Sequence, residues 1–302
     1  MTKINLQRFA DDPINVRRYE PEFAELLRAV FTKKAYFRDF FGGTIATLDG
    51  ITNNDKAFTV KTSDIPVAVG SAYDTGENVA FGTGTGSTNR FGNRTEVIYV
   101  NTDVPYSWEW TIHEGIDRHT VNNDMDAAIA DRLELQAQAR ISQFNTHHGK
   151  FISNSAGKTI SGGASVTKDN VADLFNALDK YFIDIEATGT RVVKCTADVY
   201  NAVVDSGLST TFKNSAVDVD NNIIRTFKGF QIEEVPAAMF QKNEVMYAYI
   251  QNVGKAFTGI ETTRTIEAQD FDGIAIQGAG KAGEYIPPVN KAAVAKVTVT
   301  GA

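Results

Sequence analysis

Residues 63–95 place the strongest constraint on how this chain can fold. They lie between two strand-like segments and include Phe81-Gly-Thr-Gly-Thr-Gly-Ser-Thr-Asn-Arg-Phe-Gly92, which has too few apolar residues to form a core. A long irregular loop inside a compact domain is uncommon and is usually functional or disordered. A hairpin extended by such a loop does not stabilise itself in a monomer. We therefore expect the segment to be ordered against a neighbouring surface that satisfies its backbone and the side chains of Tyr73, Phe81 and Phe91.

The two segments that flank this loop are predicted to be strands. Ala57–Lys61 precedes it, and apolar side chains alternate strictly with other residues at Val104, Tyr106, Trp108, Trp110 and Ile112. Alternation with a period of two indicates a strand with one covered face. Residues 57–112 are together predicted to form a long hairpin with a glycine-rich tip. We interpret the aromatic face as core or subunit interface, with a stacking platform for bases or sugars as the alternative.

A long helix is predicted after the hairpin. Asn122 and Asn123 suit an N-cap, and the chain from Met125 to about Gly149 lacks internal glycine and proline. Its apolar stripe comprises Met125, Ile129, Leu133, Ala137, Ile141 and Phe144. Because this stripe is narrow, we expect the helix to cover a sheet edge rather than to sit in a core. His147-His148 is expected to meet the dipole at the helix C-terminus.

The second half of the chain reads as a separate α/β or α+β unit. The Gly/Ser/Thr-rich stretch 157–165 is the best candidate boundary. Beyond it we predict an amphipathic helix (Val171–Phe182), a strand (Arg191–Cys195) and a second helix (Val199–Gly207). A polar loop (208–222), strands near 223–235 and 244–251, and a strand-rich tail (255–302) are predicted to follow. The chain begins with an extended arm, followed by a helical pattern from Pro21 that ends at Gly42-Gly43.

Composition and charge exclude several classes of protein. The net charge is −7 and the pI is about 5.2, so nothing drives the chain globally toward nucleic acid or anionic membranes. One cysteine, Cys195, excludes an internal disulfide framework and is expected to be buried in a strand. The sequence has neither an apolar run long enough for a membrane helix nor the apolar core of a signal peptide, so we expect synthesis in the cytoplasm without export.

The motifs that resemble catalytic or binding sites each lack required context. Gly278-Ala-Gly280-Lys-Ala-Gly283 matches a dinucleotide fingerprint, but no helix follows, so we expect a glycine-rich turn between strands. Asp218–Asn222 resembles the start of a calcium loop, yet Ile223 and Gly229 stand where that loop needs glycine and glutamate. We expect no metal, no cofactor and no enzymatic activity.

The order of the predicted elements resembles the major capsid proteins of tailed bacteriophages with the Hong Kong 97-type fold. Two stretches add to the resemblance: Met1-Thr-Lys-Ile-Asn-Leu-Gln-Arg-Phe-Ala10 is similar to the opening of head proteins from phages of Gram-positive hosts, and Gly229-Phe-Gln-Ile-Glu-Glu-Val-Pro236 is similar to an axial-domain stretch. The resemblance implies an α+β fold made of an N-terminal arm and helix (1–43), an extended-loop hairpin with flanking strands (44–122), a spine helix in the peripheral domain (123–165), an axial domain (166–254) and strands that return to the peripheral domain (255–302).

The resemblance also implies a function and partners. The chain would assemble in the bacterial cytoplasm into hexamers and pentamers of an icosahedral virion shell that encloses double-stranded DNA without sequence-specific binding. A separate scaffolding protein, a portal protein and a decoration protein would be partners, and no membrane would be involved. The residues implied in contacts between subunits are Arg17, Arg18, Tyr73, Phe81, Arg90, Phe91 and Arg94. Because the hairpin tip carries arginine but no lysine, we expect a shell without the Lys–Asn cross-links of one branch of the family.

Three alternatives remain open at this point. An encapsulin-type nanocompartment shell has the same fold, although the long arm and extended hairpin favour a virus. A β-rich carbohydrate-binding surface protein would use the Trp108 and Trp110 face, but the sequence has no export signal. A nucleotide-dependent enzyme rests on the glycine motif alone.

Overall fold

The computed structural model describes most of the chain outside its N-terminus and the loop between the two predicted hairpin strands. The described residues are 33–43, 45–47, 56–63, 95–121, 125–206, 215–218, 223–259 and 261–301, with Ile65, Val67, Val69, Gly70, Tyr73, Arg90 and Phe91. The predicted arm and the helical pattern from Pro21 lie almost wholly outside them. The chain forms two compact units, one of Met1–Thr47 with Ser107–Ala302 and one of Leu48–Tyr106.

The larger unit contains a sheet built around one long strand, β13 (Gly273–Tyr285). Antiparallel partners of β13 are β4 (Trp108–Asp117), β12 (Thr262–Glu267) and β11 (Lys255–Thr258). The short β1 (Ala46–Thr47) pairs with β11 in parallel, and α2 (Arg118–Val121) follows β4. In β4 the even-numbered side chains are more buried than the odd-numbered ones, as the period of two in the sequence predicts.

The glycine motif at 278–283 lies inside β13, so the predicted turn between strands is wrong. Gly280 pairs directly with Trp110 of β4, and a Cβ atom on Gly280 would lie 2.7 Å from three atoms of the indole ring. A Cβ on Gly283 would lie 2.6 Å from the ring of Phe257. The glycines therefore give two aromatic side chains room to lie flat on the strand, and they do not form a phosphate-binding turn.

Gly280→Ala is expected to destabilise the protein, although glycine-to-alanine changes at unstrained positions usually stabilise. The added methyl would push the indole of Trp110, whose other neighbours include the Arg140 guanidinium, 4.2 Å from its ring centroid. Such overpacking costs about 1–3 kcal/mol. Urea unfolding of the unassembled subunit measures the change, with the exposed neighbour Ala279→Ser as the control. Equal stability of Gly280→Ala and the unaltered protein would contradict this packing.

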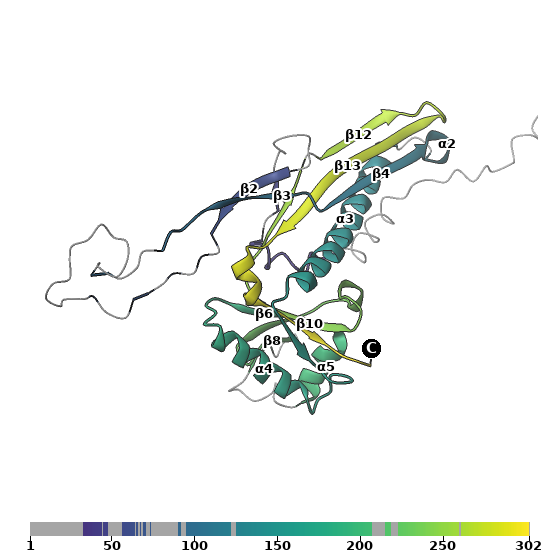
Figure 1. The fold of residues 1–302 in the computed structure, drawn as a ribbon. Helices are drawn as coiled ribbons and strands as arrows, with labels where there is room; N and C mark the ends of the chain where they lie inside the picture. The colour runs from purple at the N-terminus through teal and green to yellow at the C-terminus, as the bar shows by residue number, and fades with distance from the viewer. Residues whose placement is uncertain are drawn as a thin grey trace, which may run out of the picture. The chain divides into compact units, whose positions relative to one another are not determined.

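The long helix α3 (Met125–Ser155) extends past the predicted end and lies along the long-strand sheet (Figure 1). Its contacts with β4 are both polar and aromatic: Arg132 donates to both oxygens of Glu114 at 2.7 and 2.6 Å, and the ring centroids of Phe144 and Trp108 lie 4.8 Å apart. The predicted apolar stripe is only partly covered, because Leu133 and Ala137 are exposed. The C-terminal part of α3 enters the core instead, where Ile152 is fully buried.

A seven-stranded sheet forms the rest of the larger unit. Its strand order is β5-β14-β10-β6-β9-β8-β7. These strands cover Lys158–Ser161 (β5), Val294–Thr298 (β14), Glu244–Ile250 (β10), Arg191–Cys195 (β6), Phe230–Glu234 (β9), Ile223–Phe227 (β8) and Ser215–Asp218 (β7). The predicted Gly/Ser/Thr boundary thus contains a paired strand, β5, and the predicted polar loop contains β7. Short 3-10 helices occupy Ala237–Met239 (η3) and Pro288–Ala293 (η4).

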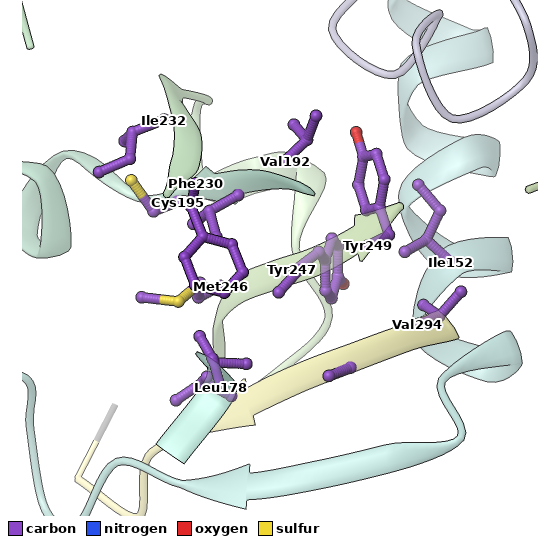
Figure 2. Packing of buried hydrophobic residues seen from close by; sticks show 14 of the residues in the cluster. Ile152, Leu178, Val192, Cys195, Phe230, Ile232, Met246, Tyr247, Tyr249 and Val294 are labelled. Carbon is purple, nitrogen blue, oxygen red and sulfur yellow. The ribbon is translucent and has the colours of Figure 1, made fainter. Parts of the chain in front are cut away.

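Two different layers cover the central strands of this sheet (Figure 2). On one face, helix α4 (Val171–Asp184) places Phe175 with its ring centroid 5.8 Å from that of Phe230. The five apolar positions predicted for α4 are all buried, and α5 (Ala197–Asp205) contacts α4. On the other face, Tyr249 contacts Phe40, with centroids 4.9 Å apart. Cys195 is fully buried in β6, as predicted.

The smaller unit contains one two-stranded antiparallel sheet. Its strands are β2 (Lys56–Thr62) and β3 (Val100–Pro105), which confirms the paired base of the predicted hairpin. The predicted continuous strand through 104–112 is nevertheless two strands, because β3 ends at Pro105 and β4 begins at Trp108. Proline has no backbone N–H to donate to a neighbouring strand. Burial nevertheless alternates from residue to residue across 104–110, so the sequence pattern does not reveal the break between the two strands.

Candidate functional site

The smaller unit carries most of the exposed large apolar side chains that the structure describes. Nine of fourteen lie between residues 65 and 100: Ile65, Val67, Val69, Tyr73, Phe91, Val97, Ile98, Tyr99 and Val100. Large exposed apolar patches mark sites of protein–protein or membrane interaction. These nine residues are therefore the candidate functional site, and we call them the apolar arm.

The base of the hairpin has one polar and one mainly apolar face. Thr59 lies opposite Asp103 in the ladder, and its hydroxyl donates to that carboxylate at 2.8 Å. Lys56 forms an ion pair with the same carboxylate. The hydrogen bonds from Lys56 and Thr59 hold the pKa of Asp103 below its ordinary value. Phe58 lies opposite Val104 on the other face, where Val104 is buried.

Three of the seven residues predicted to contact other subunits are described in the structure. The rings of Tyr73 and Phe91 meet edge to face, with centroids 4.9 Å apart, and both side chains are exposed. Arg90, which directly precedes Phe91 in the chain, is half-buried. The other four predicted contacts, Arg17, Arg18, Phe81 and Arg94, lie outside the described residues.

The sequence prediction missed the largest part of the apolar arm. Val97, Ile98, Tyr99 and Val100 are each more than half exposed. They form the run Val-Ile-Tyr-Val, whose β-branched and aromatic residues are typical of strands. The sequence therefore contains a strand signal at Val97–Val100, but it is a continuous apolar run, which a period of two does not detect.

A buried ion cluster fixes residues 33–43 to the seven-stranded sheet. Lys194 of β6 is 2 % exposed, and its Nζ lies 3.0 Å from Oδ2 of Asp39 and also pairs with Glu233 of β9. The hydroxyl of Tyr249 donates to Oδ1 of Asp39 at 3.0 Å. Burial favours the neutral form of Glu233, but Lys194 and Lys34 outweigh burial and hold its pKa below the ordinary value. Both carboxylates therefore depend on Lys194 for compensation.

A second buried cluster lies where β4 begins. Glu284 of β13 accepts hydrogen bonds from the Ser107 hydroxyl at 2.9 Å and the Trp108 indole at 3.0 Å. Burial raises the pKa of Glu284, although these hydrogen bonds oppose the rise. The ring of His147 stacks on Trp108, with centroids 4.1 Å apart. His148 lies beside the carboxylate, with its Nε2 3.6 Å from Oε1 of Glu284.

His148 does not have the role that the sequence predicts. It lies inside α3 rather than at its C-terminus, and burial lowers its pKa to about 3, so the ring is uncharged at neutral pH. A neutral ring cannot offset the helix dipole. Within the described part of the chain, its Nε2 has no hydrogen-bond partner.

The stability of the unassembled subunit is expected to fall as pH drops from about 6.5 toward 3. In that range the unfolded chain protonates His148 while the folded chain, with its pKa of about 3, does not. Each pH unit below the unfolded pKa therefore costs about 1.4 kcal/mol, or about 2 kcal/mol at pH 5. Glu284 acts in the opposite direction, because its raised pKa lets the folded state bind a proton more readily.

Chemical denaturation at several pH values would isolate the contribution of His148. His148→Leu should flatten the pH dependence between 6.5 and 4, whatever its effect on stability at pH 7.5. His119→Gln replaces a ring that is 80 % exposed and serves as the control. If the free energy of unfolding of His148→Leu depends on pH as steeply as that of the unaltered protein, His148 is not the cause of the pH dependence.

The structure gives little support for the alternative ligand sites. Trp110 is 4 % exposed, and Trp108 is covered by His147 and Phe144, so the pair offers no open stacking platform. Among the described residues, no group of three or more His, Cys, Asp or Glu side chains is placed to bind a metal. No helix in that part of the chain has both the length and the apolar character needed to cross a membrane.

Comparison with solved structures decides the fold. The structure matches the mature capsid of bacteriophage PhiM1 with a TM-score of 0.64 and 11% sequence identity, over 90% of this chain and 89% of that one. The capsid of the cyanophage P-SCSP1u matches with a TM-score of 0.63 and 11% identity, over 90% of each chain. The chain has the fold of phage capsid proteins.

A third match has a lower TM-score. A virus-like particle from Pyrococcus furiosus matches with a TM-score of 0.52 and 13% identity, over 91% of this chain and 96% of that one. No protein-family model matches the sequence. No curated protein matches it either. The capsid fold is therefore recognisable in the architecture, while the sequences have diverged almost completely.

Proposed function

We propose that this chain is the major capsid subunit of a tailed bacteriophage, forming hexamers and pentamers of an icosahedral shell around double-stranded DNA. The observation that carries the proposal is the match to phage capsid structures over about nine-tenths of both chains. The apolar arm adds independent support, because a subunit that never associates gains nothing from nine exposed large apolar side chains.

The proposal divides the chain as the Hong Kong 97-type fold does. The N-terminal arm and helix are 1–43, the extended-loop hairpin and flanking strands 44–122, the spine-helix region 123–165, the axial domain 166–254 and the strands returning to the peripheral domain 255–302. Arg17, Arg18, Tyr73, Phe81, Arg90, Phe91 and Arg94 are proposed to contact other subunits. The support is the order of α3, the seven-stranded sheet and β13 along the chain.

The proposed role is structural rather than enzymatic, and it involves further partners. We propose assembly in the bacterial cytoplasm with a separate scaffolding protein, a portal protein and a decoration protein. The net charge of −7 fits a shell that encloses DNA without gripping it. An encapsulin-type nanocompartment is the second candidate, and the matches to phage capsids with TM-scores of 0.64 and 0.63 favour the phage capsid over it.

Negative-stain electron microscopy tests the proposed function. The protein is expressed alone and together with the scaffolding gene of its phage, and both samples are imaged after purification. Shells, tubes, or rings of five and six subunits are the expected result. A monodisperse monomer under both conditions would overturn the proposal.

Denaturing gel electrophoresis of mature particles is expected to show one monomer band. The hairpin tip between 63 and 95 contains no lysine, so it has no amine for a Lys–Asn cross-link; the nearest lysines are Lys56 and Lys61. A ladder of covalent multimers would show that this expectation is wrong.

A further inference from the structure

The ion cluster around Lys194 brings one amine into contact with two carboxyl groups inside the fold. Lys194 lies on β6, the central strand of the seven-stranded sheet, and its Nζ lies 3.0 Å from Oδ2 of Asp39. The same Nζ pairs with Glu233 on the neighbouring strand β9. A carboxyl group beside an amine is a target for that nucleophile, and a second carboxylate can serve as the base that removes its protons.

The other oxygen of Asp39 accepts two hydrogen bonds. The hydroxyl of Tyr249 donates to Oδ1 at 3.0 Å, and the backbone N–H of Phe40 donates to it at 3.1 Å. When a nucleophile adds to a carboxyl carbon, negative charge develops on the remaining oxygen, and donors already aimed at that oxygen stabilise the charge. The cluster therefore contains an oxyanion site in addition to a nucleophile and a base.

Backbone hydrogen bonds fix the position of Asp39. The backbone carbonyls of Asp39 and Phe40 accept from the N–H groups of Asn252 and Gly254 at 2.9 and 3.1 Å. The ring of Phe40 also meets that of Tyr249 edge to face. Groups held in such contact react as though their concentration were about 10⁵–10⁸ M. Condensation of an amine with a carboxylate, which is unfavourable between free molecules in water, becomes feasible under these conditions.

We infer that Nζ of Lys194 and Cγ of Asp39 join in an amide bond within one chain, formed by the protein's own side chains after folding. Glu233 takes a proton from Nζ, and the free amine attacks Cγ while negative charge collects on Oδ1. Glu233 passes this proton, and then a second one from Nζ, to Oδ2. The bond between Cγ and Oδ2 breaks, and Oδ2 leaves as water. The ammonium and the carboxylate thus become one amide and one water molecule, and Glu233 is a carboxylate again at the end.

The balance of charge in the cluster favours the amide. Lys194 is almost completely buried, and a buried charge is costly even when it is paired. The amide removes this charge together with that of Asp39, and Glu233 keeps the ammonium of Lys34 as its partner. The side chains of Asp39 and Glu233 are still 23 and 28 % exposed, so water favours their charged forms. We therefore expect the bond to form more slowly than the chain folds, and the newly folded subunit to hold the ion cluster.

A second lysine in the same sheet has a carboxylate partner but no base. Lys296 of β14 lies with its Nζ 2.7 Å from Oε1 of Glu244, and among the described residues this is the one carboxylate with which it pairs. Since no other carboxylate is placed there to carry protons from the amine, we expect this pair to remain ionic. The bond is therefore specific to the cluster around Lys194.

Mass spectrometry of the intact chain tests the bond directly. The unaltered protein is measured at intervals after purification, both as free subunit and in particles, and its mass is expected to fall by one water molecule. Trypsin should then release a branched peptide made of residues 39–56 and 192–213, because Lys194 in an amide is no longer cleaved. The bond joins two residues of one chain, so it adds no band of covalent multimers on a denaturing gel. A chain that fails to assemble can still form it, and the result is independent of the proposed function.

Three variants test the assigned roles. Glu233→Gln removes the base and is expected to keep the full mass. Glu234→Gln changes the adjacent, exposed carboxylate and should form the bond as the unaltered chain does, which makes it the matched control. Tyr249→Phe removes one of the two donors to Oδ1 and should slow the reaction about a hundredfold, the usual effect of losing one oxyanion donor.

Three results would overturn the inference. Full mass after prolonged incubation, in free subunits and in particles alike, would show that no bond forms. Loss of water without the branched peptide would mean that a succinimide forms instead, for which Asp49-Gly50 and Asp272-Gly273 are the candidate positions. Formation of the branched peptide in Glu233→Gln at the rate of the unaltered chain would show that Glu233 does not carry the protons.

Discussion

Replacing residues 63–99 with Asn-Gly is expected to leave a folded subunit that forms no particles. The ladder places Thr62 directly opposite Val100, and Asn-Gly is the preferred two-residue loop for such a pair. The change removes eight described apolar side chains that are exposed in the single chain, from Ile65 to Tyr99. Since burying one such side chain contributes about 1.5–3 kcal/mol, each subunit would lose on the order of 10 kcal/mol of association energy.

The folded state of this variant can be checked independently of assembly. No described residue between 63 and 99 belongs to the buried core. The removed residues lie wholly within the smaller unit, Leu48–Tyr106, so the larger unit keeps all of its residues. Circular dichroism and thermal unfolding of the free subunit should therefore resemble those of the full chain. A matched control, Lys61→Gln, changes the polar face of the hairpin base and should still assemble. Normal shells from the shortened chain would show that the apolar arm is not needed for association.

Local periodicity made parts of the fold predictable. The positions Val171, Leu174, Phe175, Leu178 and Phe182 recur at helical spacing, and all five are buried in α4. Alternation likewise identified β4, in which every second side chain is the more buried one. In both elements one face is covered, so apolar residues recur in the sequence with the period of a helix or a strand.

Other features depend on contacts between distant residues, which a single sequence does not display. The glycines of 278–283 predict a turn from sequence alone, whereas in the structure they make room for the rings of Trp110 and Phe257. The α3 helix meets its sheet through the ion pair of Arg132 with Glu114 as well as through the ring of Phe144, so the face that covers the sheet is only partly the apolar stripe. Of the apolar arm, the sequence analysis identified Tyr73 and Phe91 but not Val97–Val100, because the exposure of a side chain is a property of the folded chain.

Lys194→Met is expected to destabilise the free subunit by about 3–5 kcal/mol, the range found when one partner of a buried ion pair is removed. Methionine is similar in volume, so the loss is electrostatic rather than a cavity. Without the Nζ atom, Asp39 and Glu233 become two poorly compensated carboxylates. The Lys34 ammonium pairs with Glu233 and therefore compensates one of the two. Denaturant unfolding measures the loss, and Lys242→Met on the surface is the matched control, expected within about 0.5 kcal/mol.

Neutralising the whole cluster distinguishes uncompensated charge from lost packing. Replacing a complete buried ion cluster with neutral groups is often nearly neutral for stability, so Lys194→Met combined with Asp39→Asn and Glu233→Gln should recover most of the loss. The Tyr249 hydroxyl, which donates to Oδ1 of Asp39, keeps an acceptor in Asp39→Asn because the side-chain amide retains one oxygen. Because Asp39 belongs to the segment that this cluster fixes to β6, the single variant Lys194→Met should also increase proteolysis within 33–43. A triple variant no more stable than Lys194→Met would contradict the assignment of the loss to uncompensated charge.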